Sequence, residues 1–133
     1  MEITLLLDND LAGNGIFIEQ GLKETGWDQV LQFHFKRLRD YGLPANLPDQ
    51  EIWRFVQTQR LLLITNNRNE DSPHSLEATI RRDNSPDCLP IFTIGDLDKF
   101  RKNRDYAERV LERFYEYLLL IDGVRGTGRI FLP

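Results

Sequence analysis

Short apolar runs alternate along the chain with longer segments in which apolar residues return every three or four positions. The short runs are typical of buried strands, and the longer segments are typical of amphipathic helices. The predicted strands are residues 3–7, 29–35, 61–65, 91–94 and 129–133. The predicted helices are residues 15–26, 49–59, 75–82 and 97–121. Strands and helices therefore alternate from one end of the sequence to the other.

This alternation determines the expected fold class. Strands that are apolar throughout belong to sheets covered on both faces, and successive parallel strands are usually joined by a helix. We therefore expect an α/β fold, a three-layer α/β/α Rossmann-like sandwich with a mainly parallel sheet. Residues 1–133 have the length of one ordinary domain, and no repeat or long linker divides them.

The amino-acid composition indicates which classes of protein the chain can belong to. The chain is 41% hydrophobic and 29% charged, which is typical of a globular protein. No apolar stretch reaches the ~18–20 residues of a membrane-spanning helix, and the first residues lack the features of a signal peptide. Cys88 is the one cysteine, so no internal disulfide can form, and we expect a cytoplasmic protein without a membrane partner. With two histidines, His34 and His74, a zinc site is not favoured.

The charge balance limits how the chain could hold nucleic acid. Its formal net charge is −4, whereas proteins that bind nucleic acid by charge alone are usually basic. RNA binding would therefore need a metal ion or a local basic patch, for which the candidates are Lys99, Arg101, Lys102, Arg104, Arg109 and Arg113. Acidic residues interleave with these cations, so a solvated helix face with ion pairs is the favoured interpretation.

Polar residues follow three of the predicted strands. Asp8-Asn9-Asp10 follows residues 3–7, residues 66–71 follow Thr65, and Gly95-Asp96 follows residues 91–94. The carboxyl ends of parallel strands meet at one edge of a sheet, where such folds place their sites. Carboxylate and amide oxygens there suit Mg²⁺ or Mn²⁺, although Asp and Asn are also common turn residues. Asp49 is predicted to be the N-cap of helix 49–59, which leaves its carboxylate at either edge.

Two stretches resemble a known family. "PDQEIWRFVQTQRLLLITNNRN" (48–69) resembles the part of PIN-like domains that runs from an acid through a helix with an Ile-Trp pair to a strand ending in Thr. With "LLLDND" (5–10), the chain resembles the small PIN-like proteins of bacterial toxin–antitoxin systems, and more closely a group of uncharacterised, cyanobacterial-type PIN-like proteins. That group also matches "SLEATIRRDNSP", "LPIFTIGDLDKF" and "GTGRIFLP", so the resemblance covers nearly the whole chain.

The resemblance implies a Rossmann-like sandwich and, in active members, Mg²⁺- or Mn²⁺-dependent cleavage of RNA. Asp8, Asp49, Thr65 and Asn67 match family positions, so the expected catalytic residues are Asp8, Asp49 and Asn67. The expected metal ligands are Asp8, Asp10, Asp49, Asn67, Asn69 and Glu70. Many members have Asp where this chain has Asn67 and Asn69, and an amide binds Mg²⁺ more weakly than a carboxylate. We therefore expect weak or no nuclease activity in isolation, or activity that needs a partner such as an antitoxin-like protein.

The resemblance leaves one acid open. PIN-like domains carry a helical Glu between the first two matched blocks, and its counterpart could be Glu19, Glu24 or Asp40. The sequence does not rank these three.

A second enzyme class competes. Haloacid-dehalogenase-like phosphatases have Asp-x-Asp after one strand, Thr-Asn after another and a late Gly-Asp, which resemble Asp8-Asn9-Asp10, Thr65-Asn66 and Gly95-Asp96. Asp8 would then be the nucleophile and Asp10 the general acid. The chain departs from that pattern at Leu11-Ala12, where the family has Gly-Thr, and the required lysine could only be Lys99 or Lys102.

A third hypothesis is a catalytically inactive PIN-like module that binds a protein or RNA. Tyr115 and Tyr117 flank the apolar stripe of the last helix, which makes a homodimer surface a candidate there. Packing in the core is the favoured interpretation for most of the aromatic rings in this helix.

Overall fold

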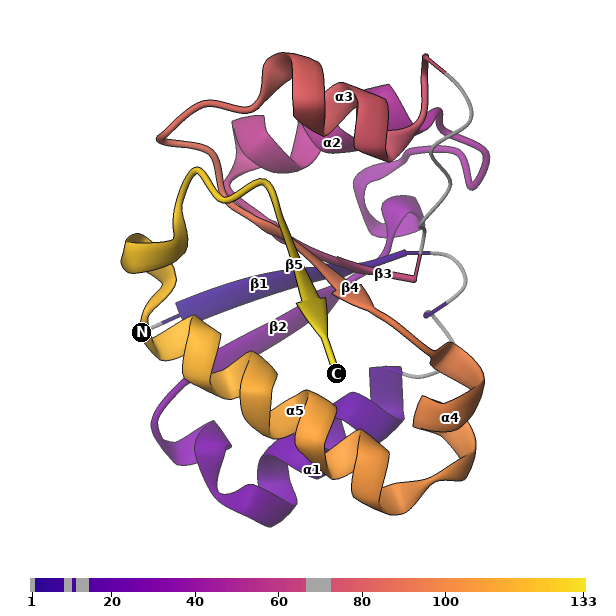
Figure 1. Cartoon of the computed structure of the whole chain (residues 1–133). Coiled ribbons are helices and arrows are strands. Elements are labelled where there is room, and N and C mark those ends of the chain that lie inside the picture. Colours follow the sequence, from indigo (N-terminus) through magenta and orange to yellow (C-terminus); the bar gives the residue numbers. More distant parts are fainter. Residues whose placement is uncertain (1, 9–10, 12–14, 67–72) are drawn as a thin grey trace.

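The computed structural model builds one five-stranded parallel sheet, which it describes for residues 2–8, 11, 15–66 and 73–133 (Figure 1). The strand order is β2-β1-β3-β4-β5. The strands are β1 (Glu2–Leu7), β2 (Gln32–Lys36), β3 (Leu62–Thr65), β4 (Ile91–Ile94) and β5 (Arg129–Leu132). The α-helices are α1 (Gly15–Thr25), α2 (Asp49–Gln59), α3 (Leu76–Asp83), α4 (Leu97–Lys102) and α5 (Arg104–Leu119). Short 3₁₀ turns occupy Trp27–Gln29, Leu38–Tyr41 and Ile121–Val124.

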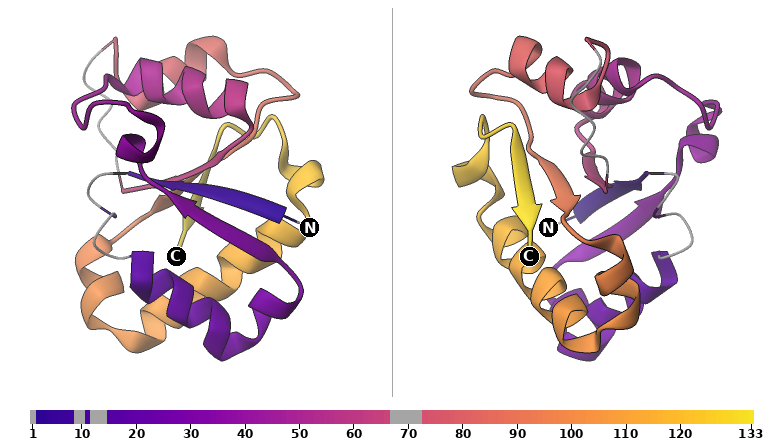
Figure 2. Two further views of the ribbon diagram at one scale, coloured as in Figure 1. Left: turned by 180° about the vertical axis from the view of Figure 1, so that it is seen from behind. Right: turned by 45° about the vertical axis from the view of Figure 1, so that its right-hand side comes forward.

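Helices cover both faces of the sheet, as Figures 1 and 2 show from three directions. Helices α2 and α3 lie on one face, and α1 and α5 lie on the other. Alternation along β1 produces the two layers, because Leu5 and Leu7 pack in the core on the α1 and α5 side while Leu6 packs with α2 and α3. The predicted three-layer α/β/α sandwich with a parallel sheet is thereby confirmed.

The larger of the two cores lies under α5. Phe92 of β4 meets Phe114 of α5 edge to face, with ring centroids 4.9 Å apart, and both rings are buried. On the opposite face, Trp53 and Val56 of α2 and Ile80 of α3 form the second core with Leu63. Both faces of β3 are therefore buried, which is why its sequence is apolar without alternation.

Two predicted elements differ from the structure. The single helix predicted over residues 97–121 is wrong, because Asn103 ends α4 and begins α5. The Asn103 side chain accepts a 3.0 Å hydrogen bond from the N–H of Tyr106, so it acts as a cap in a stretch whose periodicity continues across it. The strand predicted at 29–35 begins later, at Gln32, because residues 27–29 form a 3₁₀ turn.

Among the described residues, the structure contains no helix that is long and apolar enough to span a membrane.

Candidate functional site

A carboxylate and a hydroxyl meet at the carboxyl edge of the sheet. The Oγ1 atom of Thr65 donates a 2.6 Å hydrogen bond to Oδ2 of Asp8. Asp8 follows β1, and its own N–H donates to the carbonyl of Ile64 at 3.1 Å, which continues the β1–β3 pairing past the end of β1. Thr65 is fully buried and Asp8 is half-buried. The expected proximity of these two residues is therefore confirmed.

The next residue carries an oxygen with no hydrogen bond. Oδ1 of Asn66 is buried and has no hydrogen-bond partner among the described residues. A buried carbonyl oxygen without a donor is energetically unfavourable unless a ligand or water satisfies it. The resemblance to PIN-like domains points to the following amide, Asn67, and nothing in the run of amides distinguishes Asn66 from its neighbours in the sequence. The structure thus adds Asn66 to the candidate ligands.

Asp49 lies at the start of α2 but does not cap it. The N-cap is Pro48, which has no side-chain hydrogen-bonding group, and Asp49 is the first helical residue, so the predicted N-cap role of Asp49 is wrong. A carboxylate in the first turn still stabilises the helix through its dipole. Pro48 has a φ of −59° and an extended ψ of 146°, and a proline disfavours the helical conformation in the residue before it, so the helix begins after Pro48.

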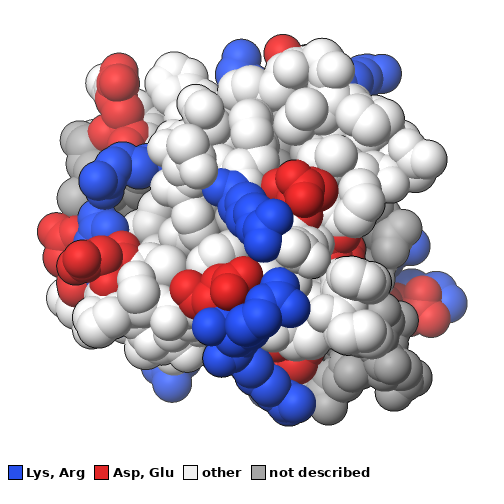
Figure 3. All heavy atoms as spheres, turned by 90° about the horizontal axis from the view of Figure 1, so that it is seen from above, with Lys and Arg blue, Asp and Glu red and all other residues white. Residues whose placement is uncertain are grey.

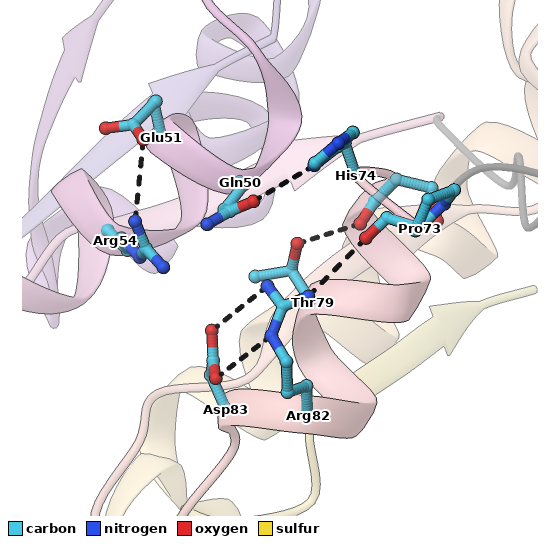
Figure 4. Close-up of polar contacts among 9 residues, drawn as sticks. Gln50, Glu51, Arg54, Pro73, His74, Thr79, Arg82 and Asp83 are labelled. Carbon is cyan, nitrogen blue, oxygen red and sulfur yellow. Dashed lines mark hydrogen bonds and ion pairs between the residues drawn. The ribbon is translucent and has the colours of Figure 1, made fainter.

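The start of α2 lies at the same edge as the end of β3. Gln50 and His74 are in contact, with 3.4 Å between Oε1 of Gln50 and Nδ1 of His74 (Figure 4). Turning the Gln50 amide brings its oxygen within 2.6 Å of Nη2 of Arg54, and its NH₂ group then faces His74. His74 precedes α3 and follows β3, so Asp49 is on the carboxyl side of the sheet, as is Asp8. That the two carboxylates share one ion stays a prediction.

The remaining predicted ligands, Asp10, Asn67, Asn69 and Glu70, lie outside the described residues. Within the described part of the chain, no group of three or more His, Cys, Asp and Glu side chains is placed to hold a metal ion.

The structure places the three candidates for the helical acid on two different elements. Glu19 forms an exposed ion pair with Lys23 on α1, at 3.6 Å, and Glu24 lies further along that helix. Asp40 follows β2 and therefore lies at the carboxyl edge beside β1, where its carboxylate accepts the N–H of Arg37 at 2.8 Å. Burial, together with the Asp40 charge, raises the pKa of Tyr41.

The two lysines that the phosphatase hypothesis requires have other surroundings. The Lys99 ammonium lies 5.1 Å from the centre of the Tyr106 ring, and Lys102 lines a cavity between α1 and α5. Asp96 caps α4 by accepting the N–H of Lys99 at 3.0 Å. Asp96 therefore acts as the cap of α4, and Lys99 packs against Tyr106.

A second cluster of polar side chains lies between the sheet and α3. Arg129 of β5 donates from Nη1 to Oγ1 of Thr93 at 2.6 Å and from Nε to Glu77 of α3 at 2.9 Å. Thr93 is aligned with Thr65 on the neighbouring strand, so this cluster adjoins the Asp8–Thr65 pair. Sequence reasoning did not identify Arg129 or Glu77, because neither belongs to a local pattern.

Two of the six residues of the predicted basic patch form ion pairs along α5. Arg104 pairs with Glu108 at 3.0 Å and Arg113 with Glu116 at 3.3 Å, so the favoured interpretation as a solvated helix face is supported by the structure. The opposite side of the molecule, above α2 and α3, also shows basic and acidic side chains interleaved (Figure 3). Core packing is confirmed for Tyr115, which is fully buried and therefore not part of a self-association surface.

Comparison of the chain with protein-family models, with curated proteins and with solved structures found no match.

Proposed function

We propose that the chain is a PIN-like, divalent-metal-dependent ribonuclease with a weakened acidic site. The observation that carries this proposal is the 2.6 Å hydrogen bond from Thr65 to Asp8 at the carboxyl edge of a parallel sheet. Sites of open parallel α/β sheets lie at that edge. The residues that meet there are the ones through which the chain resembles PIN-like domains, and the start of α2 with Asp49 lies on the same side.

The donor set suits Mg²⁺ or Mn²⁺. Asp8 and Asp49 would supply carboxylate oxygens, Asn66 an amide oxygen that is buried without a hydrogen bond, and water the remaining positions. The expected ligands Asp10, Asn67, Asn69 and Glu70 are part of the same proposal. A bound divalent ion polarises a phosphoryl oxygen and lowers the pKa of a bound water. Thr65 helps to orient Asp8, because its hydroxyl donates a hydrogen bond to Oδ2.

The weakness of the site follows from its charge. Amides at Asn66, Asn67 and Asn69 neutralise none of the charge of a divalent ion, so affinity rests on few carboxylates. We therefore propose slow cleavage of single-stranded RNA, or cleavage that needs a protein partner, either an antitoxin-like protein or a second copy of the chain in a homodimer.

The test is cleavage of a labelled single-stranded RNA during a Mn²⁺ titration, with wild type, Asp8→Asn and the control Asp28→Asn. Asp28 is an exposed acid in the turn between α1 and β2, so its replacement makes the same charge change elsewhere. Cleavage by wild type and Asp28→Asn that is lost in Asp8→Asn supports the proposal. Equal cleavage by all three proteins would indicate a contaminating nuclease and contradict it.

Two further readouts separate the alternatives. Mn²⁺ binding that requires Asp8, without any cleavage, would assign an inactive PIN-like module. Phosphatase turnover with a covalent aspartyl phosphate on Asp8 would instead assign the haloacid-dehalogenase-like reaction. Sedimentation of the same samples measures whether the protein is a monomer or a dimer.

A further inference from the structure

A hollow with two arginines lies at the amino edge of the sheet, opposite the Asp8–Thr65 pair. It consists of two adjoining cavities of about 430 and 250 Å³, which share Arg60, Leu89 and Arg125 as lining residues. The larger cavity also contacts the end of α2 and the loop before β4, and the smaller one is lined by Ile3, Leu62 and Ile121 together with Glu2 and Thr4. The hollow therefore has a polar half and a more apolar half, and both arginines line both halves.

The wall of the larger cavity is held in place by paired hydrogen bonds. The Gln57 amide donates to the carbonyl of Leu89 at 2.8 Å and accepts the N–H of Leu89 at 2.9 Å. Gly126 donates to the carbonyl of Cys88 at 2.9 Å and packs directly on Pro86. These contacts fix the loop before β4 to α2 and to the segment before β5, so the cavity is formed before any ligand binds.

Arg125 is held in place by two hydrogen bonds that leave part of its guanidinium unused. Its Nε donates to Asp122 at 2.9 Å and its Nη1 donates to the carbonyl of Asp87 at 3.2 Å. Neither bond uses Nη2, which has no hydrogen-bond partner among the described residues. A guanidinium carries five N–H donors in a rigid plane, so this one can still bind an anion through its remaining edge.

Arg60, directly after the end of α2, lines both cavities together with Arg125. Its φ of 56° is in the left-handed region, and it is the only residue other than glycine with a positive φ in the described chain. Among the described residues its guanidinium has no ion-pair partner. A cation that lines both cavities without a counter-ion, in a backbone conformation that favours glycine, is available for a ligand.

We propose that Arg60 and Arg125 bind the phosphate group of a small phosphate monoester, whose apolar body packs against Ile3, Leu62 and Ile121. One guanidinium fork saturates a carboxylate, whereas a phosphate monoester offers three terminal oxygens and two negative charges to two forks. Asp87 and Glu2 also line the hollow and oppose the two cations, so binding of the phosphate depends on direct hydrogen bonds from both guanidinium groups. The site is independent of the proposed ribonuclease site at the other edge.

The experiment titrates phenyl phosphate and inorganic phosphate into ¹⁵N-labelled protein at constant ionic strength. We expect saturable amide shifts at Gln57, Arg60, Cys88 and Leu89, with phenyl phosphate binding several-fold more tightly because it fills the apolar half. Arg60→Gly should weaken phenyl phosphate binding at least tenfold while its Tm is no lower than that of wild type, since glycine tolerates the left-handed conformation. This variant therefore separates loss of the guanidinium from loss of folding.

Two controls accompany it. Arg54→Ala removes an arginine of the same helix that pairs with Glu51 and lines neither cavity, so binding should be unchanged. Asp87→Asn removes the opposing charge and should tighten binding several-fold. Unchanged binding in Arg60→Gly, or equal shifts with sodium chloride, would overturn the proposal. Tighter binding of dimethyl phosphate or a short oligonucleotide than of phenyl phosphate would also overturn it, in favour of a phosphodiester.

Discussion

Thr65 and Asp8 are 57 positions apart in the chain, and a 2.6 Å hydrogen bond joins their side chains at the ends of β3 and β1. Thr65→Val keeps the shape of the buried side chain and removes the donor. A hydrogen bond to a charged group contributes about 1.5–3 kcal/mol, and we expect a loss of stability in that range. Urea unfolding measures it. Thr4→Val, on β1 and half-buried, is the matched control and should change stability by less than about 0.5 kcal/mol.

Gly126 is required by its backbone conformation and by its neighbour. Its φ is +84°, and a Cβ there would lie 3.0 Å from Cα of Pro86. Left-handed strain and overpacking together predict that Gly126→Ala lowers the free energy of unfolding by about 2–4 kcal/mol. Gly123, in the preceding 3₁₀ turn, has open space around its Cα, so Gly123→Ala should be nearly neutral in the same thermal or urea unfolding experiment. Equal effects of the two substitutions would contradict this account.

The Arg129–Glu77 ion pair predicts a non-additive double mutant. The Arg129 side chain is 6% exposed and that of Glu77 is 19% exposed. Arg129→Met leaves Glu77 of α3 with the exposed Arg81 as its ion-pair partner, at 3.3 Å, and should cost about 2–4 kcal/mol. Adding Glu77→Leu removes the remaining carboxylate, and the double variant should recover at least about 1 kcal/mol relative to the sum of the single variants. A double-mutant cycle by urea unfolding gives the coupling, and strict additivity would show that the pair contributes nothing.

Tyr115 predicts a stability change at alkaline pH. Burial raises the pKa of its hydroxyl well above the ordinary value of 10.0, and this hydroxyl has no hydrogen-bond partner among the described residues. The unfolded chain therefore releases this proton at a lower pH than the folded chain does. Below pH 10 the ionisation of this hydroxyl does not change stability. Above pH 10 the free energy of unfolding falls as pH rises. Tyr115→Phe should be at least as stable as wild type at pH 7 and lose less stability between pH 9 and 11, as urea unfolding at each pH will show.

The fold was predictable because short apolar runs alternate along the chain with longer segments in which apolar residues return every three or four positions. Four short apolar runs became central or neighbouring strands, and the helices at 15–26, 49–59 and 75–82 lie within a residue or two of α1, α2 and α3. The break at Asn103 was not predictable from periodicity, since apolar spacing continues through it and only the cap hydrogen bond interrupts the helix. The boundary at Pro48 was missed for a similar reason, because Asp49 is the better capping residue by type.

The site was predictable only in part. Asp8 and Thr65 follow apolar strands, and the parallel order brings their ends together. Asn66 was indistinguishable from its neighbours in sequence, because burial of one amide oxygen depends on the tertiary structure. Arg129 and Glu77 are 52 positions apart, so no periodic pattern in the sequence indicates that they pair. Arg60 and Arg125 likewise come together only when α2 and the segment before β5 reach the same edge of the sheet.

The position of β1 between β2 and β3 in the sheet also has a consequence for protein synthesis. Its partner β2 follows closely, but its other partner, β3, begins at Leu62. At about 5–20 residues per second, a ribosome needs roughly 3–11 s to add the 57 residues that separate Asp8 from Thr65. During that interval the apolar run Leu5-Leu6-Leu7 has one edge unpaired and exposed to other chains. Conditions that slow translation between β2 and β3 should therefore increase aggregation of the nascent chain more than a delay after β3.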